Sequence, residues 1–179
     1  FTTVLPRDAA RGLEGVRKIF QPGSSTSLLF MNCETGPLTD PQVRRDLARS
    51  LDRHRLTSLC YENPSGFVAR SLIPPRMGRY NDGIMRESSA GERLAKAIDR
   101  PLRMLVIWGP RPYLSEPTAV SNEIKAELGA VGVEVQVQQA ANVDEYFRRA
   151  QAGDADLILT GWIADSADTV GFLDALVSS

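Results

Sequence analysis

The chain has 179 residues, of which 42% are hydrophobic and 24% are charged, and its formal net charge is −1. These values are typical of a soluble globular protein with one domain or about one and a half. A near-neutral chain lacks the broad positive field that nucleic acid or anionic lipid requires, and no run approaches the ~18–20 apolar residues of a membrane-spanning helix.

The first sixty residues predict a pair of strands followed by a long helix. The strands are expected at 1–5 and 25–32, with a turn between them at Pro22-Gly23. Asp40-Pro41 is typical of a helix start, with Asp as the cap and Pro at the first helical position. Apolar residues then recur at helical spacing, which predicts one helix over 41–60, whose arginines we expect to form surface ion pairs with aspartates such as Asp46.

The remaining chain divides into a crossing and a regular unit. Residues 61–100 are rich in proline and glycine and predict a long connection with a short helix at 89–98. Residues 101–179 predict strands and helices in strict alternation, with these bounds: strands at 102–108, 133–137 and 155–160, and helices at 116–128, 143–150 and 168–177. This β-α-β-α-β-α order predicts an α/β fold with parallel strands and right-handed crossovers. Because the chain stops inside a predicted helix, we expect it to be a segment of a longer protein.

One candidate site lies where the last predicted strand ends. Gly161-Trp162 follow the strand, Asp165 comes three residues after the tryptophan, and Ser166 is next. Carboxyl ends of strands are where open α/β sheets bind ligands, so an aromatic ring and a carboxylate there favour a small guest with a cationic or polar head. Two alternatives stay open: Asp165 caps the following helix, and Trp162 is a core or hinge aromatic.

The sequence offers no set of catalytic residues. His54 is the only histidine, and Cys33 and Cys60 lie at no metal-ligand spacing. Neither a nucleophile motif nor a glycine-rich phosphate loop occurs. We therefore predict no enzyme, no cofactor and no metal, and we expect two free thiols, with a disulfide as the alternative.

Three segments, in order along the chain, carry a resemblance to a known family. They are 29–53 with its Pro-x-x-Asp-x-x-Val-Arg, 72–80 with its two prolines before Gly-Arg-Tyr, and 123–173 with Gly161-Trp162-x-x-Asp165. Together these segments resemble the extracellular solute-binding proteins of the peptide/nickel type (family 5), which serve ABC importers. The resemblance implies that residues 1–179 form part of the C-terminal lobe of a two-lobed, periplasmic-binding-protein-like fold with a mixed sheet.

The same resemblance implies a function and partners. In that family the acid of Gly-Trp-x-x-Asp holds the α-ammonium group of a peptide, which implies this role for Asp165 beside Gly161, Trp162 and Ser166. The expected protein is a monomer at the periplasmic or extracellular face of the membrane. It closes on peptides or other small cationic or polar solutes with the N-terminal lobe of its parent, and it delivers them to an ABC permease. The alternative function is the ligand-sensing domain of a cytoplasmic transcriptional regulator.

Overall fold

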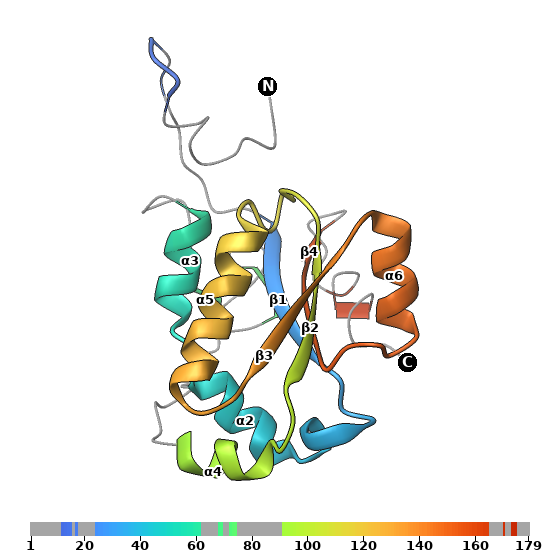
Figure 1. Ribbon diagram of the computed structural model, residues 1–179. Coiled ribbons are helices and arrows are strands. Elements are labelled where there is room, and N and C mark those ends of the chain that lie inside the picture. The colour runs from blue at the N-terminus through green and yellow to red at the C-terminus, as the bar shows by residue number, and fades with distance from the viewer. Residues whose placement is uncertain are drawn as a thin grey trace.

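A four-stranded mixed sheet forms the centre of the computed structural model, which describes residues 12–15, 17, 24–61, 68–69, 72–74, 91–164, 170 and 173–174 (Figure 1). The strands are β1 (Ser25–Met31), β2 (Leu102–Ile107), β3 (Val135–Ala140) and β4 (Leu157–Ile163), in the spatial order β1-β4-β2-β3. β2 is parallel to both β3 and β4, whereas β1 is antiparallel to β4. The predicted mixed α/β sheet is confirmed.

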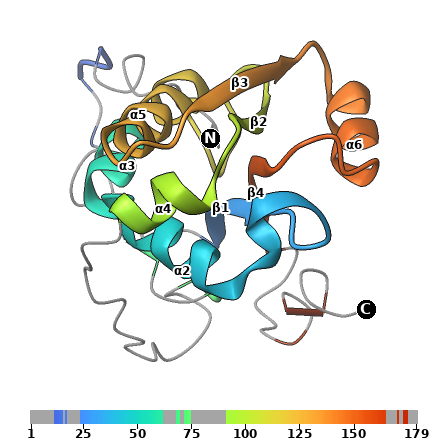
Figure 2. The ribbon, with the colours of Figure 1, turned by 60° about the horizontal axis from the view of Figure 1, so that its bottom comes forward.

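Helices cover both faces of this sheet. They are the 3-10 helix η1 (Gly36–Thr39) and the α-helices α2 (Pro41–Arg49), α3 (Arg53–Cys60), α4 (Gly91–Ala97), α5 (Pro117–Ala130) and α6 (Val143–Gln151). Figures 1 and 2 show α2, α3, α4 and α5 together on one side of the sheet and α6 on the other. The sheet is therefore the middle one of three layers.

The core follows from the alternation of side chains along the strands. Met104, Val106 and Leu157 pack in the larger cluster, with buried residues of α2, α4 and α5. Leu105 and Ile107 point to the opposite face and pack there with residues that include Tyr146 of α6. Since successive side chains of a strand face opposite ways, β2 is buried on both faces, as parallel strands in α/β proteins usually are.

The first helical region differs from its prediction, because two helices replace one. α2 ends at Arg49 and α3 begins at Arg53. The Asp52 carboxylate accepts a 3.0 Å hydrogen bond from the amide of Arg55 and so caps a new helix. The predicted start at Asp40 is confirmed, since its carboxylate accepts a 2.7 Å hydrogen bond from the amide of Gln42. Local capping therefore divides a stretch whose apolar spacing alone looks continuous.

The other element predictions agree with the structure within a few residues. β3 begins at Val135, two residues later than predicted, and continues to Ala140. The predicted strand at 1–5 lies outside the described residues. Of the predicted helix at 168–177, the structure describes Val170, Leu173 and Asp174, all helical.

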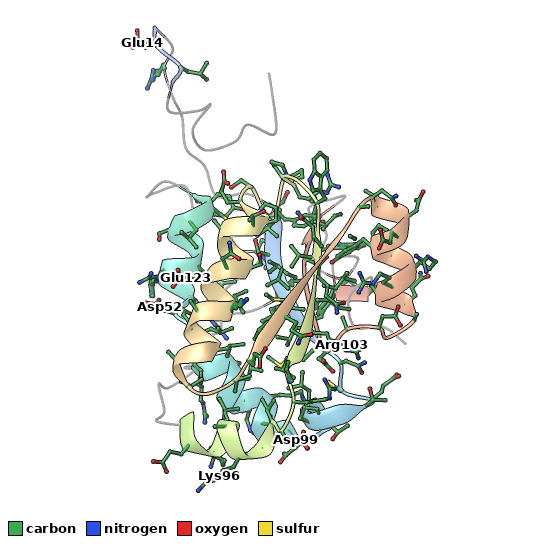
Figure 3. The ribbon with its side chains drawn as sticks, viewed as in Figure 1. Glu14, Asp52, Lys96, Asp99, Arg103 and Glu123 are labelled. Carbon is green, nitrogen blue, oxygen red and sulfur yellow. The ribbon has the colours of Figure 1, made fainter. Side chains whose placement is uncertain are left out.

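Two buried aspartates fasten the elements to one another. At the amino edge of the sheet, Asp156 accepts hydrogen bonds from both terminal nitrogens of Arg100, at 2.9 and 2.7 Å, and from the amide of Arg103 at 2.8 Å. Figure 3 shows Arg103 and Asp99 toward the end of the sheet opposite the β2–α5 loop.

The second aspartate, Asp46, is fully buried and binds Arg93 of α4. The predicted surface ion pairing of Asp46 is therefore wrong, because this carboxylate faces the interior between α2 and α4.

Candidate ligand-binding site

The carboxyl ends of β2 and β4 are neighbours at one edge of the sheet. β2 runs parallel to β3 on one side and to β4 on the other. The connection from β2 to β3 passes through α5 on one face, and the connection from β3 to β4 passes through α6 on the other (Figure 1). The carboxyl ends of the parallel strands β2, β3 and β4 thus meet at one edge of the sheet, and this is the edge where open α/β sheets bind ligands.

The end of β4 places the predicted Gly161 and Trp162 on opposite faces of the sheet. Leu157 and Leu159 belong to the cluster under α5, so alternation puts Gly161 on that face and Trp162 on the face of α6. Both residues are half-buried. Trp162 pairs with Thr26 of β1 in the antiparallel ladder. Two of the predicted site residues thus lie at the edge where a ligand site was expected.

Gly161 is the residue that permits the close packing at this edge. A Cβ atom at this position would lie 2.5 Å from Cγ of Tyr113 and 2.6 Å from the carbonyl oxygen of Thr26. Both distances are below the closest approach of real Cβ atoms, and the Thr26 oxygen is backbone that cannot move aside cheaply. The ring of Tyr113 therefore lies directly against the backbone of β4.

The end of β2 places a tryptophan at this edge that is not among the predicted site residues. Trp108 directly follows β2, and 64% of its surface is exposed. Gly109 comes next with a φ of +75°, a left-handed conformation that glycine adopts without strain. A large exposed ring at the carboxyl ends of the strands is a candidate surface for ligand contact. Its position directly before Gly109-Pro110, a turn signal, was the available clue.

Tyr146 of α6 packs against β4 on the other face of the sheet. This side chain is 2% exposed, and its hydroxyl donates a 3.0 Å hydrogen bond to the carbonyl oxygen of Leu159. Burial raises the pKa of Tyr146 to about 12, so the hydroxyl keeps its proton at neutral pH and remains a donor. This hydrogen bond therefore joins α6 to β4 within the core of the fold.

Asp165 and Ser166 lie outside the described residues, so their role stays a prediction. Cys33 is exposed and Cys60 buried, both as free thiols, and burial raises the pKa of Cys60. Within the described ranges, no three potential metal ligands gather, and no helix is long and apolar enough to cross a membrane.

Comparison with known proteins gives a family match over almost the whole chain. Residues 3–179 match the family model described as bacterial extracellular solute-binding proteins, family 5 Middle. The dipeptide-binding protein of Escherichia coli (strain K12) is 27% identical over 97% of this chain and 34% of that protein. Di/tripeptide-binding protein 2 of Pseudomonas aeruginosa (strain UCBPP-PA14) is 31% identical over 83% of this chain and 29% of that protein.

Solved structures show the same fold. HbpA2 from Haemophilus parasuis superposes with a TM-score of 0.78 at 22% sequence identity, covering 88% of this chain and 32% of that one. The chain thus spans about a third of the length of the relatives it matches. The two curated relatives are named as peptide-binding proteins and not as enzymes. The expected family and the periplasmic-binding-protein-like fold are therefore confirmed.

Proposed function

Since the chain belongs to the bacterial extracellular solute-binding proteins of family 5, we propose that it is part of the C-terminal lobe of the substrate-recognition component of an ABC importer. The proposed ligands are peptides or other small cationic or polar solutes. The observation that carries this proposal is the position of Gly161 and Trp162 at the carboxyl edge, beside the exposed Trp108 at the end of β2. That edge offers aromatic contact surface at the carboxyl ends of the strands, where open α/β sheets bind ligands.

The proposed site combines aromatic contact with one charge. Trp162 and Trp108 give a ligand large, rigid contact area, and Asp165 is the proposed partner of a ligand ammonium group, with Ser166 beside it. A charge-assisted hydrogen bond of this kind is worth about 1.5–3 kcal/mol where water is excluded. The named ligands of the two curated relatives, dipeptides and tripeptides, carry such an ammonium group at their amino end.

High affinity requires the second wall of the site. The relatives are about three times as long as this chain, so the remaining lobe of the parent protein is the proposed second wall. Closure of two lobes on a ligand by a hinge motion buries it from both sides, whereas one lobe alone should bind weakly. The proposed setting is a monomer at the periplasmic or extracellular face of the membrane, with an ABC permease as the recipient of the closed form.

Calorimetric titration of the full-length protein tests this function. The ligands are dipeptides, tripeptides, other small cationic solutes and nickel chelates, and the variants are Asp165→Ala and, as the matched control, Asp168→Ala. We expect Asp165→Ala to weaken binding of an ammonium-bearing ligand at least tenfold, about 1.4 kcal/mol, with the control near wild type. Equal binding by Asp165→Ala would make Asp165 a helix cap. Wild-type protein that binds none of these solutes would contradict the proposal and favour the sensor domain of a regulator.

A further inference from the structure

We propose that Tyr113 is a positioning residue for ligand binding. Its ring lies against Gly161, its backbone carbonyl is held by two hydroxyl groups, and together these contacts fix the 108–116 loop relative to β4. The loop begins with the exposed Trp108, and Gly161 immediately precedes Trp162. The consequence for the ligand rests on the proposed function, whereas the fastening of the loop rests on geometry alone.

The loop contains a tight turn that brings Tyr113 to the sheet. The amide of Arg111 donates to the carbonyl of Leu114, and the amide of Leu114 donates to the carbonyl of Arg111, both at 2.9 Å. Leu114 is 1% exposed and packs in the larger core cluster. Burial of Leu114 sets the depth of the turn, but a single apolar anchor does not set its orientation.

Orientation comes from the carbonyl oxygen of Tyr113. The hydroxyl of Tyr61, at the end of α3, donates to it at 2.9 Å, and the hydroxyl of Ser27 in β1 donates to it as well. A carbonyl oxygen has two lone pairs, so these two donors satisfy it fully. Burial raises the pKa of Tyr61 to about 12, which keeps this hydroxyl protonated and donating at physiological pH.

A second contact joins the loop to the same end of α3. The hydroxyl of Ser115 donates a 2.7 Å hydrogen bond to the carbonyl of Cys60, the residue before Tyr61. The loop is thus tied to α3 at two adjacent positions and to β1 at a third. These three contacts come from parts of the chain that precede β2, whereas the ligand edge itself is made by β2 and β4.

The contact between the Tyr113 ring and Gly161 completes this group of contacts. Ser27, which binds the Tyr113 carbonyl, is the β1 partner of Gly161, which accommodates the Tyr113 ring. Ser27, Tyr61, Tyr113 and Gly161 therefore form one contiguous group, which we call the Tyr113 anchor. Because the anchor contacts both the loop after β2 and the end of β4, it fixes the spacing between Trp108 and Trp162. A preformed spacing lowers the ordering cost of binding.

A pair of tyrosine variants tests the anchor in the full-length protein. Tyr61→Phe removes the hydroxyl that binds Tyr113, and Tyr146→Phe is the matched control, since its hydroxyl binds the carbonyl of Leu159 at 3.0 Å within a strand. Two readouts are measured: hydrogen exchange of the amides in residues 109–114, and affinity for dipeptides and tripeptides by calorimetry.

We expect Tyr61→Phe to speed exchange in 109–114 about fivefold and to weaken peptide binding about three- to tenfold, the effect of one hydrogen bond. Tyr146→Phe should leave both quantities within about twofold of wild type. It should nevertheless lower the melting temperature about as much as Tyr61→Phe does, because each variant loses one hydrogen bond. Tyr113→Leu, which keeps the carbonyl but removes the ring, should also speed exchange in 109–114.

Two results would overturn the inference. The first is equal behaviour of Tyr61→Phe and Tyr146→Phe in exchange and in affinity. The second is faster exchange in Tyr61→Phe with peptide affinity unchanged, which would leave Tyr113 a purely structural residue. If the wild-type protein binds no peptide, the proposed function fails, and the exchange contrast between the two variants then decides by itself whether the anchor holds the loop.

Discussion

At the amino edge of the sheet the Asp156 carboxylate is 2% exposed and receives hydrogen bonds from Arg100 and Arg103, whereas at the carboxyl edge Trp108 is 64% exposed and Ile163 40% exposed. At the amino edge, the buried Asp156 carboxylate is paired within the chain. The carboxyl edge instead leaves apolar side chains open and uses neutral hydroxyl groups to hold its loop. The difference separates the edge that stabilises the fold from the edge that is available to a ligand.

The largest expected effect on stability comes from removing the buried charge at the amino edge. Asp156→Ala should lower the free energy of unfolding by about 3 kcal/mol, because a buried ion pair loses one member. This is the low end for such pairs, since the side chains of Arg100 and Arg103 are 40% and 42% exposed and can be hydrated again. Denaturant unfolding measures the effect, and the exposed Asp154→Ala is the control, expected within about 0.5 kcal/mol of wild type.

Protonation of the Asp156 carboxylate by acid should reduce stability less than the substitution does. Burial alone would raise the pKa of Asp156, but the hydrogen bonds from Arg100 and Arg103 outweigh burial and lower the pKa below its ordinary value of 3.8. A carboxylate with a lowered folded-state pKa contributes stability that is complete above the unfolded-state pKa and is lost as pH falls through the folded-state value. Unfolding curves of wild type and Asp156→Asn should therefore converge below pH 3.8. Parallel pH profiles would contradict this assignment.

At the carboxyl edge, the packing of Gly161 is the feature to test. Gly161→Ala should destabilise the protein by about 1–3 kcal/mol, because the added methyl group meets the Tyr113 ring and the Thr26 carbonyl. Gly129→Ala in α5 is the control: nothing lies within 4 Å of its Cβ position, and it should stabilise by about 0.5–1 kcal/mol. Thermal melts of both variants check the pair, and a neutral Gly161→Ala would show that the packing is loose.

The substitution with the smallest expected effect on stability gives the clearest contrast between the two edges. Trp108→Ala should change the free energy of unfolding by less than about 0.5 kcal/mol, because the ring is largely in water. The same variant should weaken peptide binding by about tenfold if the ring contacts the ligand. Calorimetry together with a melting curve measures both quantities. A loss of stability without a loss of affinity would assign Trp108 to the fold and leave the ligand edge to β4.

The sequence predicts most of the fold because its patterns are local. Alternation and helical spacing identify β2, α5 and α6 within a few residues of their observed bounds. The single helix over 41–60 fails because Leu51 and Leu56 preserve helical spacing across a break that Asp52 creates by capping. The burial of Asp46 is not readable either, because its partner Arg93 is 47 residues away in sequence.

The candidate site divides in the same way. Gly161 and Trp162 could be predicted, because a glycine and an aromatic residue at the end of an apolar strand form a local signal. The contact between Tyr113 and Gly161 could not, because it depends on two segments that only the folded sheet brings together. The donors to the Tyr113 carbonyl come from Ser27 and Tyr61, which precede it by 86 and 52 residues. Long-range contacts of this kind leave no periodicity in a sequence.

The order of strands in the sheet has a consequence for how the chain folds. β4 is the last strand in the described part of the chain, yet it lies inside the sheet, and among the described strands it alone pairs with β1. The ladder between them pairs Met31 with Leu157 and Ser25 with Ile163, residues that lie far apart in the sequence. Such non-local pairing slows folding, because a long loop must close before the contacts form. A nascent chain that ends before Leu157 can thus assemble β2, α5 and β3, while β1 still lacks a partner.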